Sequence, residues 1–430
     1  MEELSAATGI SSRALEQATP QGGLVHRGLR SLVCRRLVGV RAGRLELIDG
    51  GERWVFGRDD GELPAAKILV RDPRFYRHAL FGGSLGAAEA YIRGFWDCSD
   101  LVSLVRFFCR NPDVSSSVER GPARIIEAFS RAGHWLRSNT LSGSRRNIAA
   151  HYDLGNEFFS LFLDDTMAYS CAQFPAWQSS LYEASIAKFD GICQKLELSP
   201  SDHLLEIGTG WGGFAVYAAQ RYGCRVTTTT ISQKQYDFAR ERVRAAGLDS
   251  QVRVLNVDYR QLGGTYDKLV SIEMIEAVGY EYFDTFFRTC AERLKPDGMM
   301  LLQAIIMREQ GYERYLRSVD FIQRYIFPGG CLPSVGAICH SVGRASGLQL
   351  LQLEDITPHY AETLARWRLR FHENLEQIRS LGFGDDFLRT WHYYFCYCEG
   401  AFRERATGVV QMLFGNRNCG RGLPSTAPSA

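Results

Sequence analysis

Residues 204–214 read Leu-Leu-Glu-Ile-Gly-Thr-Gly-Trp-Gly-Gly-Phe, an apolar strand that breaks into a glycine-rich turn and then opens a helix. The turn puts Gly208, Gly210 and Gly212 where a cofactor comes so close to the backbone that a Cβ atom would block it. A dinucleotide-binding turn has the spacing G-x-G-x-x-G, whereas this turn has G-x-G-x-G-G. Glu206 lies two residues before the first glycine, inside the strand. The stretch therefore predicts a cofactor site at the end of a buried strand.

Strands and helices alternate along the chain from about residue 202 onward. The expected strands are 203–207, 225–231, 252–257, 267–272 and 299–306, followed by later strands at 348–353 and 409–414. The expected helices are 213–222, 233–246 and 282–294, followed by a long helical region at 362–404. This alternation predicts an α/β fold, a doubly wound Rossmann-like parallel sheet that binds its ligand at the carboxyl ends of the strands.

Composition and charge are those of an ordinary globular protein. The chain has 430 residues, 45% of them hydrophobic and 23% charged, which is enough for about two to three domains with real cores. A net charge of +2 predicts no nucleic-acid partner. The apolar runs are too short to span a membrane, and the polar N-terminus is not a secretory signal. The twelve cysteines form no C-x-x-C pair, so we expect reduced thiols, a cytoplasmic location and no metal site.

The expected domain borders follow changes in composition. A small α+β unit is expected over 24–110, with strands at 44–47, 54–56 and 66–70 and an aromatic helical stretch at 74–110. The full set of expected segments is a flexible arm at 1–23, the small N-terminal unit at 24–110, a linker at 111–147, a large α/β domain at 148–415 and a disordered tail at 416–430.

Five motifs in a characteristic order carry a family resemblance. They are His151-Tyr152-Asp153-Leu154-Gly155-Asn156-Glu157-Phe158-Phe159, the glycine turn, Gln233–Gln235, Ser271–Gly279 and Phe327-Pro328-Gly329-Gly330. With them the chain resembles, over about residues 145–414, the cyclopropane-fatty-acid synthases and their mycolic acid relatives, which are class I S-adenosylmethionine-dependent methyltransferases. Glu89-Ala90-Tyr91 and Gly94-Phe95-Trp96 look like the lipid-binding N-domain of the bacterial phospholipid enzymes. The resemblance implies methylene transfer from S-adenosylmethionine to the cis double bond of an unsaturated phospholipid acyl chain.

The residues can also be considered for this chemistry by themselves. An alkene is a poor nucleophile, so the methyl donor and the double bond must be held together in a dry pocket. The carbocation that results can be stabilised by aromatic faces and must then lose a proton. Aromatic residues available for such a cage are Tyr169, Phe174, Tyr280, Phe327 and Tyr360. Each of them could equally be an ordinary core side chain.

Glu276 follows the fourth parallel strand, where α/β enzymes place active-site groups. By itself it could be an ordinary acid at a helix N-terminus. The resemblance implies that it helps to hold a bicarbonate ion that accepts the proton, together with Cys171, Gln303, the backbone of Ile305 and Tyr360. Cys171 alone would be read as a buried thiol. Gln303 stands where the best-known members have histidine, and since glutamine carries no charge, the sequence does not predict a proton relay through this side chain.

The resemblance also implies the cofactor ligands. Thr230 and Gln235 would reach the ribose and the methionine portion, Asp258 and Tyr259 would flank adenine, and Tyr169 and Ser170 would close over the methionine end. The threonines in this strand are also ordinary strand formers. The complete cofactor set expected is Tyr169, Ser170, Glu206, Gly208, Gly210, Thr230, Gln235, Asp258 and Tyr259.

Three functions compete on these grounds. The first is an enzyme that cyclopropanates olefins, the second a lipid methyltransferase that makes a methyl branch or another modified acyl chain, and the third a non-catalytic membrane-binding protein. A soluble enzyme acting on acyl chains must sit peripherally on the inner face of the cell membrane, with apolar side chains surrounded by cations. Val25, Leu29, Leu32 and Val33 with Arg27, Arg30, Arg35 and Arg36 fit this, as do Arg131, Arg137, Arg145 and Arg146. An ordinary amphipathic helix would look the same. The oligomeric state, including a homodimer, stays open.

Overall fold

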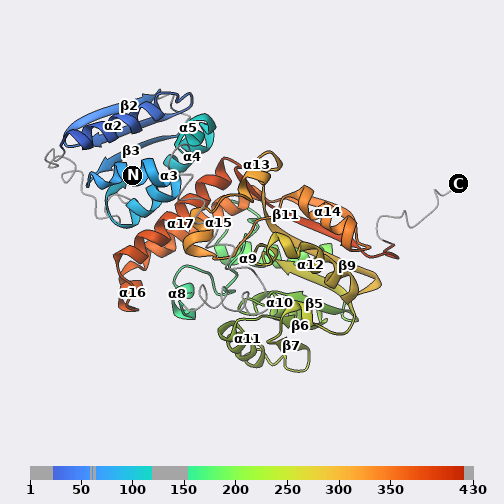
Figure 1. The fold of residues 1–430 in the computed structure, drawn as a ribbon. Helices are drawn as coiled ribbons and strands as arrows, with labels where there is room; N and C mark the ends of the chain where they lie inside the picture. Colours follow the sequence, from blue (N-terminus) through green and yellow to red (C-terminus); the bar gives the residue numbers. More distant parts are fainter. Residues whose placement is uncertain (1–22, 59–60, 62–63, 119–153, 421–430) are drawn as a thin grey trace. The chain divides into compact units, whose positions relative to one another are not determined.

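The computed structural model describes residues 23–58, 61, 64–118 and 154–420 and divides into two compact units (Figure 1). Their described residues are 23–58, 61, 64–118, 317–326 and 364–406 in unit 1, and 154–316, 327–363 and 407–420 in unit 2. Neither unit is continuous in sequence, whereas the expected domains were drawn as continuous segments. The expected arm, most of the linker and most of the tail lie outside the described residues.

Unit 2 is built on a seven-stranded sheet with the order β10-β11-β9-β8-β5-β6-β7. The strands are β5 (His203–Ile207), β6 (Arg225–Thr229), β7 (Val252–Leu255), β8 (Tyr266–Ile272), β9 (Leu294–Met307), β10 (Gln349–Asp355) and β11 (Thr407–Gly415). Neighbours from β7 to β9 are parallel, as predicted. β11 runs antiparallel to both β9 and β10, so one strand of the seven departs from the parallel direction expected for the sheet. Apolar patterning alone does not specify strand direction.

Helices cover both faces of this sheet because its strands are apolar on both sides. Leu204 packs in a core with α9, α10 and α11, whereas Leu205 packs in a second core with α12 and α14. The helices of unit 2 are α8 (Asn156–Ser160), α9 (Leu181–Lys195), α10 (Gly213–Tyr222), α11 (Gln233–Ala245), α12 (Phe283–Arg293), α13 (Glu309–Tyr315), α14 (Val335–Ala345) and the short η2 (Tyr259–Gln261), η3 (Ile275–Ala277) and η4 (Tyr280–Tyr282). The sandwich of helices around the sheet confirms the doubly wound fold.

Unit 1 contains a four-stranded sheet with the order β2-β1-β3-β4. Its strands are β1 (Arg44–Asp49), β2 (Glu52–Gly57), β3 (Ala65–Val70) and β4 (Trp96–Cys98). Its helices are α2 (Leu24–Leu37), α3 (Arg74–Ile92), α4 (Leu101–Arg110), α5 (Pro112–Val118), the π-helical η5 (Ile322–Ile326), α16 (Leu375–Ser380) and α17 (Asp385–Arg403), while α15 (Thr357–Glu373) begins in unit 2. The expected continuous helical stretch over 74–110 is wrong, because Gly94 with a φ of +71° ends it and β4 follows.

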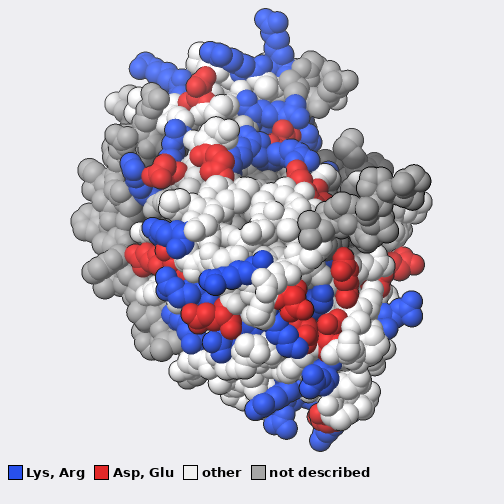
Figure 2. Space-filling view, turned by 90° about the vertical axis from the view of Figure 1, so that its right-hand side faces the viewer, with Lys and Arg blue, Asp and Glu red and all other residues white. Residues whose placement is uncertain are grey.

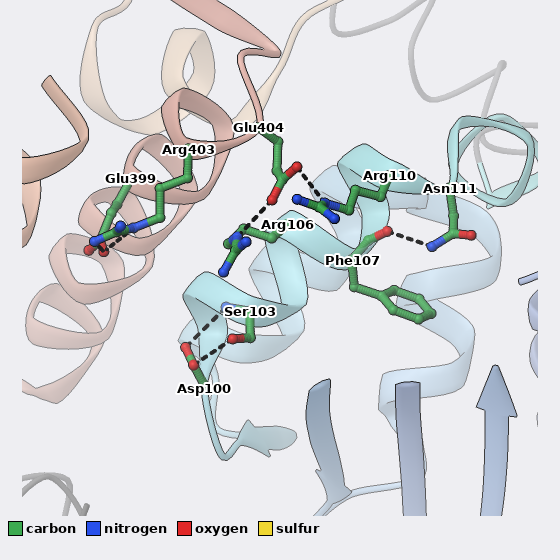
Figure 3. Close-up of polar contacts among 9 residues, drawn as sticks. All are labelled: Asp100, Ser103, Arg106, Phe107, Arg110, Asn111, Glu399, Arg403 and Glu404. Atoms are coloured by element: carbon green, nitrogen blue, oxygen red, sulfur yellow. Dashed lines mark hydrogen bonds and ion pairs between the residues drawn. The ribbon is translucent and has the colours of Figure 1, made fainter. Parts of the chain in front are cut away.

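The end of α17 is tied to α4 by charge. Glu404 accepts from Arg106 Nε at 2.7 Å and from Arg110 Nε at 2.6 Å (Figure 3). Arg389 of α17 donates to the carbonyls of Tyr91 and Trp96 at 2.6 and 2.9 Å. Cys396 of α17 also packs in the hydrophobic core of the four-stranded sheet of unit 1. Removing residues 1–110 would therefore strip α17 of its partners, so point variants are the cleaner test of this unit.

Candidate functional site

The glycine turn between β5 and α10 leaves room for a ligand. Gly208, Gly210 and Gly212 have φ values of +106°, +51° and +82°, a region that side chains with a Cβ rarely adopt. An added Cβ at Gly208 or Gly212 would press on Met274 or Ala239 at 3.2 and 3.1 Å. An added Cβ at Gly210 would meet no heavy atom within 4 Å in the described part of the chain. Gly210 therefore borders open space, which fits the close approach of S-adenosylmethionine.

The other expected cofactor residues cluster at the ends of β6 and β7. Thr230 Oγ1 donates to Gln235 Oε1 at 2.9 Å, so these two side chains lie together beside the turn. Asp258 is held by Arg260, whose Nε and Nη2 both donate to it at 2.8 Å. Tyr259 is 8% exposed and meets the ring of Phe286 edge-on, so its stacking on adenine stays a prediction.

Glu206 is turned into the protein. Its Oε2 accepts from Thr228 Oγ1 at 2.5 Å, and Thr228 Oγ1 lies 2.7 Å from Thr209 Oγ1. Burial raises the pKa of Glu206 to about 8, against the lowering effects of Thr228 and Lys188. This carboxyl is therefore largely protonated at neutral pH. A direct contact with the cofactor stays a prediction.

The segment Tyr169–Ala172 is anchored by a buried lysine that the sequence analysis did not single out. Lys188 of α9 is fully buried, and its Nζ donates to Ser170 Oγ at 2.7 Å. Tyr169 packs against Phe159 and Phe327, with ring centroids 5.5 and 6.1 Å apart. The position of Lys188 between the apolar residues Ala187 and Phe189 was the signal that could have found it.

Glu273, and not Glu276, gathers the polar groups expected around the reacting centre. Its Oε1 accepts from Gln303 Nε2 and from the backbone N–H of Cys171, both at 2.8 Å. Its Oε2 accepts from the Tyr360 hydroxyl at 2.7 Å. Glu273 also has a φ of +49°, which is unfavourable for a residue with a side chain and is found chiefly at functional sites. It lies inside the motif Ser271–Gly279, which was the signal in the sequence.

Glu276 is bonded to the one remaining group that was expected to donate a hydrogen bond to bicarbonate. Its Oε1 accepts from the backbone N–H of Ile305 at 2.5 Å, while its buried Oε2 has no partner among the described residues. Burial raises the pKa of Glu276 to about 8, and the charge of Glu273 acts in the same direction. Cys171 contributes its backbone N–H, while its thiol is buried with a pKa raised by that burial. The donors expected for a bicarbonate ion are thus occupied by two glutamates, and the site does not fit that ion.

Glu273 and Glu276 form a coupled pair, and Glu273 receives more hydrogen bonds than Glu276 does. Burial raises the pKa of Glu273 as well, but the hydrogen bonds from Tyr360, Gln303 and Cys171 and the charge of Lys188 all favour its ionised form. Glu276 has one backbone donor and the negative charge of its neighbour. These hydrogen bonds therefore favour a shared proton on Glu276 over one on Glu273. Glu273 is left as a carboxylate that can accept another.

All five expected cage aromatics belong to unit 2, but one of them is exposed. Phe174 and Tyr360 are buried, and Phe327 is close to Tyr169. Tyr280 is 52% exposed, so it is unlike the others and does not belong to a dry pocket. Among the described residues, no three His, Cys, Asp or Glu side chains are arranged to hold a metal ion.

The doubly wound sheet, the glycine turn and the acids at the strand ends define the class I S-adenosylmethionine-dependent methyltransferases. Residues 140–412 match the family described as mycolic acid cyclopropane synthetase, and the chain belongs to that family. It is therefore an enzyme of this methyltransferase class rather than a non-catalytic membrane-binding protein.

Relatives of known name agree with this membership. The chain is 37% identical to tuberculostearic acid methyltransferase UfaA1 of Mycobacterium tuberculosis, over 83% of this chain and 84% of the relative. It is 36% identical to cyclopropane-fatty-acyl-phospholipid synthase of Escherichia coli, over 83% and 89% of the two chains. Among solved structures it is similar to mycolic acid cyclopropane synthase CmaA1 complexed with SAH and CTAB, with a TM-score of 0.60, 33% identity and coverage of 63% of this chain and 98% of that one.

Proposed function

We propose that this enzyme transfers a one-carbon unit from S-adenosylmethionine to the cis double bond of an unsaturated phospholipid acyl chain, with Glu273 as the base. The observation that carries the proposal is the set of three hydrogen bonds from Tyr360, Gln303 and Cys171 to the Glu273 carboxylate. These are the groups that the family resemblance assigns to a bound bicarbonate. In this protein the Glu273 carboxylate accepts the hydrogen bonds of these groups.

The chain's own residues would perform three tasks around the bound methyl donor. S-adenosylmethionine, when bound, supplies an electrophilic methyl group. The turn at Gly208 and Gly210, with Thr230, Gln235 and Asp258, would hold the donor, while Tyr169 and Phe327 would exclude water from the reacting atoms. Glu273 would then accept the proton that the methylated acyl chain must lose. Its hydrogen bonds keep the carboxylate oriented for that transfer.

Two products can form from the acyl chain and the methyl donor alone, with no further reactant. Loss of a proton from the new methyl group with closure onto the cationic carbon gives a cyclopropane ring, the product expected from the sequence. A 1,2-hydride shift followed by loss of a methyl proton gives a methylene branch and leaves a double bond. Both add one CH2 unit to the acyl chain. A saturated methyl branch needs a reductant in addition.

The methylene branch is the second candidate, and two observations favour it. In the proposed reaction Glu273 takes the place of the bicarbonate that the family resemblance implies, so the base is fixed in the protein rather than diffusible. A relative that matches at 37% identity is named a methyltransferase and not a cyclopropane synthase. Deprotonation before the hydride shift gives the ring and deprotonation after it gives the branch, so the position of a fixed base can select between the two cations.

Lipid analysis tests the proposal directly. Phospholipids from a host that expresses the enzyme should gain one CH2 unit, and proton NMR should show ring methylene signals for the ring or vinylidene signals for the branch. Purified enzyme should turn over equally in bicarbonate-depleted and bicarbonate-supplemented buffer. Unchanged host lipids would refute the proposed reaction. A rate that rises with added bicarbonate would refute Glu273 as the base.

We propose further that the enzyme binds peripherally to the inner face of the cell membrane through α2. Leu29, Val33 and Leu37 pack on the core of unit 1, so the predicted apolar face is wrong for the first two. Leu24 and Val25 are 85% and 77% exposed instead. Arg27 and Arg35 are also exposed on this helix. The linker arginines lie outside the described residues.

Membrane binding by α2 has a specific test. The double variant Leu24→Glu/Val25→Glu should bind anionic vesicles at least about tenfold more weakly, because it removes apolar burial and adds two negative charges. Wild-type binding should fall as salt rises. Val55→Glu, on an exposed valine of β2, is the matched control. Equal binding by all three proteins in a vesicle sedimentation assay would exclude α2 as the contact.

Surface charge and helix hydropathy bear on the remaining partners. Figure 2 shows one face of the molecule, where lysine and arginine side chains are interspersed with aspartate and glutamate over much of the coloured surface. Within the described ranges, no helix combines the length and apolar character that crossing a bilayer requires. The mixed charge gives no reason to propose a nucleic-acid partner, and a homodimer stays a prediction.

A further inference from the structure

Two buried glutamines face each other across neighbouring strands. Gln303 of β9 and Gln411 of β11 are paired directly in the antiparallel register, and they are 0% and 2% exposed. Gln411 Nε2 donates to Gln303 Oε1 at 2.9 Å. A buried amide needs a partner at both its oxygen and its nitrogen. The oxygen of Gln411 and the nitrogen of Gln303 must therefore each have a further hydrogen-bond partner.

A lysine continues the chain at its outer end. Lys195, the last residue of α9, donates from Nζ to Gln411 Oε1 at 2.5 Å and also pairs with Glu354 of β10. An ammonium group can only donate, so the oxygen of Gln411 must face Lys195 and its NH2 must face Gln303. The oxygen of Gln303 then accepts, and its NH2 points inward. There it donates to Glu273 Oε1 at 2.8 Å and to the Cys171 carbonyl at 3.3 Å.

We propose that Lys195, Gln411 and Gln303 form a directional hydrogen-bond chain that holds a donor against Glu273 and keeps this glutamate ionised. The inference rests on the proposed function, in which Glu273 is the base. Lys195 and Gln411 touch no reacting atom, so they are positioning residues.

The physical reason is the symmetry of an isolated amide. Without Gln411, Gln303 could turn over and place its oxygen against the carboxylate of Glu273, which would repel the ionised form. Each hydrogen bond in the chain polarises the next in a medium of low dielectric constant. The chain thus brings the effect of an ammonium charge to Glu273 while the charge itself stays outside the pocket. A neutral Gln303 suits this role better than a group that titrates.

Other charged and titratable groups act on Glu273 and must be held constant in a test. They are Lys188 of α9, Glu276 of η3, the Tyr360 hydroxyl of α15 and the Cys171 thiol. None of them is bonded to Lys195 or Gln411 in the hydrogen bonds described for these residues. Variants in the outer chain therefore change one influence on Glu273 at a time.

The test uses the full-length enzyme with the variants Gln411→Met and Lys195→Met. Loss of the oriented donor disfavours the ionised base, so its pKa rises and the acidic limb of the kcat–pH profile should move upward by about one pH unit. Below that limb, kcat should fall by about tenfold while the affinity for S-adenosylhomocysteine stays unchanged. Lys195→Arg should restore the wild-type limb. Gln352→Met, at an exposed glutamine of β10, is the matched control.

Two measurements keep the outcomes distinct. The carboxylate band that Glu273→Gln removes from the infrared spectrum should titrate at higher pH in both methionine variants, independently of turnover. If Glu273→Gln retains turnover, the proposed base is wrong whatever the chain does. If Glu273→Gln is inactive but both methionine variants keep the wild-type limb and titration, the directional chain is refuted. If Gln411→Met fails to fold, the Lys195→Met variant, at a lysine whose side chain is 18% exposed, still tests the chain.

Discussion

Replacing Glu273 with glutamine is expected to lower kcat by about a thousandfold, within the range that a general base contributes. Glutamine preserves the size of the side chain but cannot accept a proton from the methylated acyl chain. The cofactor residues lie on other segments, so the affinity for S-adenosylmethionine should be retained. Steady-state kinetics on unsaturated phospholipid vesicles and calorimetry with S-adenosylhomocysteine measure the two quantities separately.

Glu276→Gln is the matched comparison for that result. Its pKa of about 8 means that Glu276 is already mostly protonated at pH 7, and glutamine imitates the neutral acid. We therefore expect kcat within about threefold of the wild type. The reverse pattern, with an active Glu273→Gln and an inactive Glu276→Gln, would return the proton-accepting role to Glu276 or to a bound ion.

Gly210→Val is expected to abolish detectable binding of S-adenosylmethionine and its demethylated product, a loss of at least about a hundredfold. The valine side chain would fill the open space beside the turn, and a φ of +51° is strained for a β-branched residue. Because two separate effects act in the same direction, this is the largest change in cofactor affinity that we expect from a single substitution in this chain.

A second glycine separates the two effects. Gly247 also has a positive φ, of +68°, and open space around an added Cβ in the described part of the chain, but it follows α11 in an exposed turn. Gly247→Val should lose thermal stability through backbone strain and yet bind S-adenosylhomocysteine normally in calorimetry. Normal binding by Gly210→Val would show that the cofactor does not approach this glycine.

Local patterns in the sequence determined the elements of the catalytic fold. The helix at Gly213–Tyr222 and the strand at His203–Ile207 were predicted with the borders that the structure has. Both are specified by residues within a few positions of each other, namely an apolar run, glycines with positive φ and a closing Gly223. The glycine turn is also formed by neighbouring residues, so the sequence alone predicted it as a cofactor site. The order of the five motifs indicated the family.

Only the tertiary structure decided which glutamate stands at the reacting centre. Glu273 and Glu276 lie three residues apart in one motif, and no local rule distinguishes them. The choice depends on Cys171, Gln303 and Tyr360, which strand pairing and helix packing bring in from positions far along the chain.

The same holds for other features that the sequence analysis did not anticipate. The direction of β11, the membership of α17 in unit 1 and the exposure of Tyr280 each depend on contacts between distant segments. Periodicity reports which residues are buried but not against what, because hydrophobic burial is non-directional. The sequence by itself therefore determined the class of enzyme and its cofactor turn, while long-range packing determined its base and the hydrogen bonds that keep that base ionised.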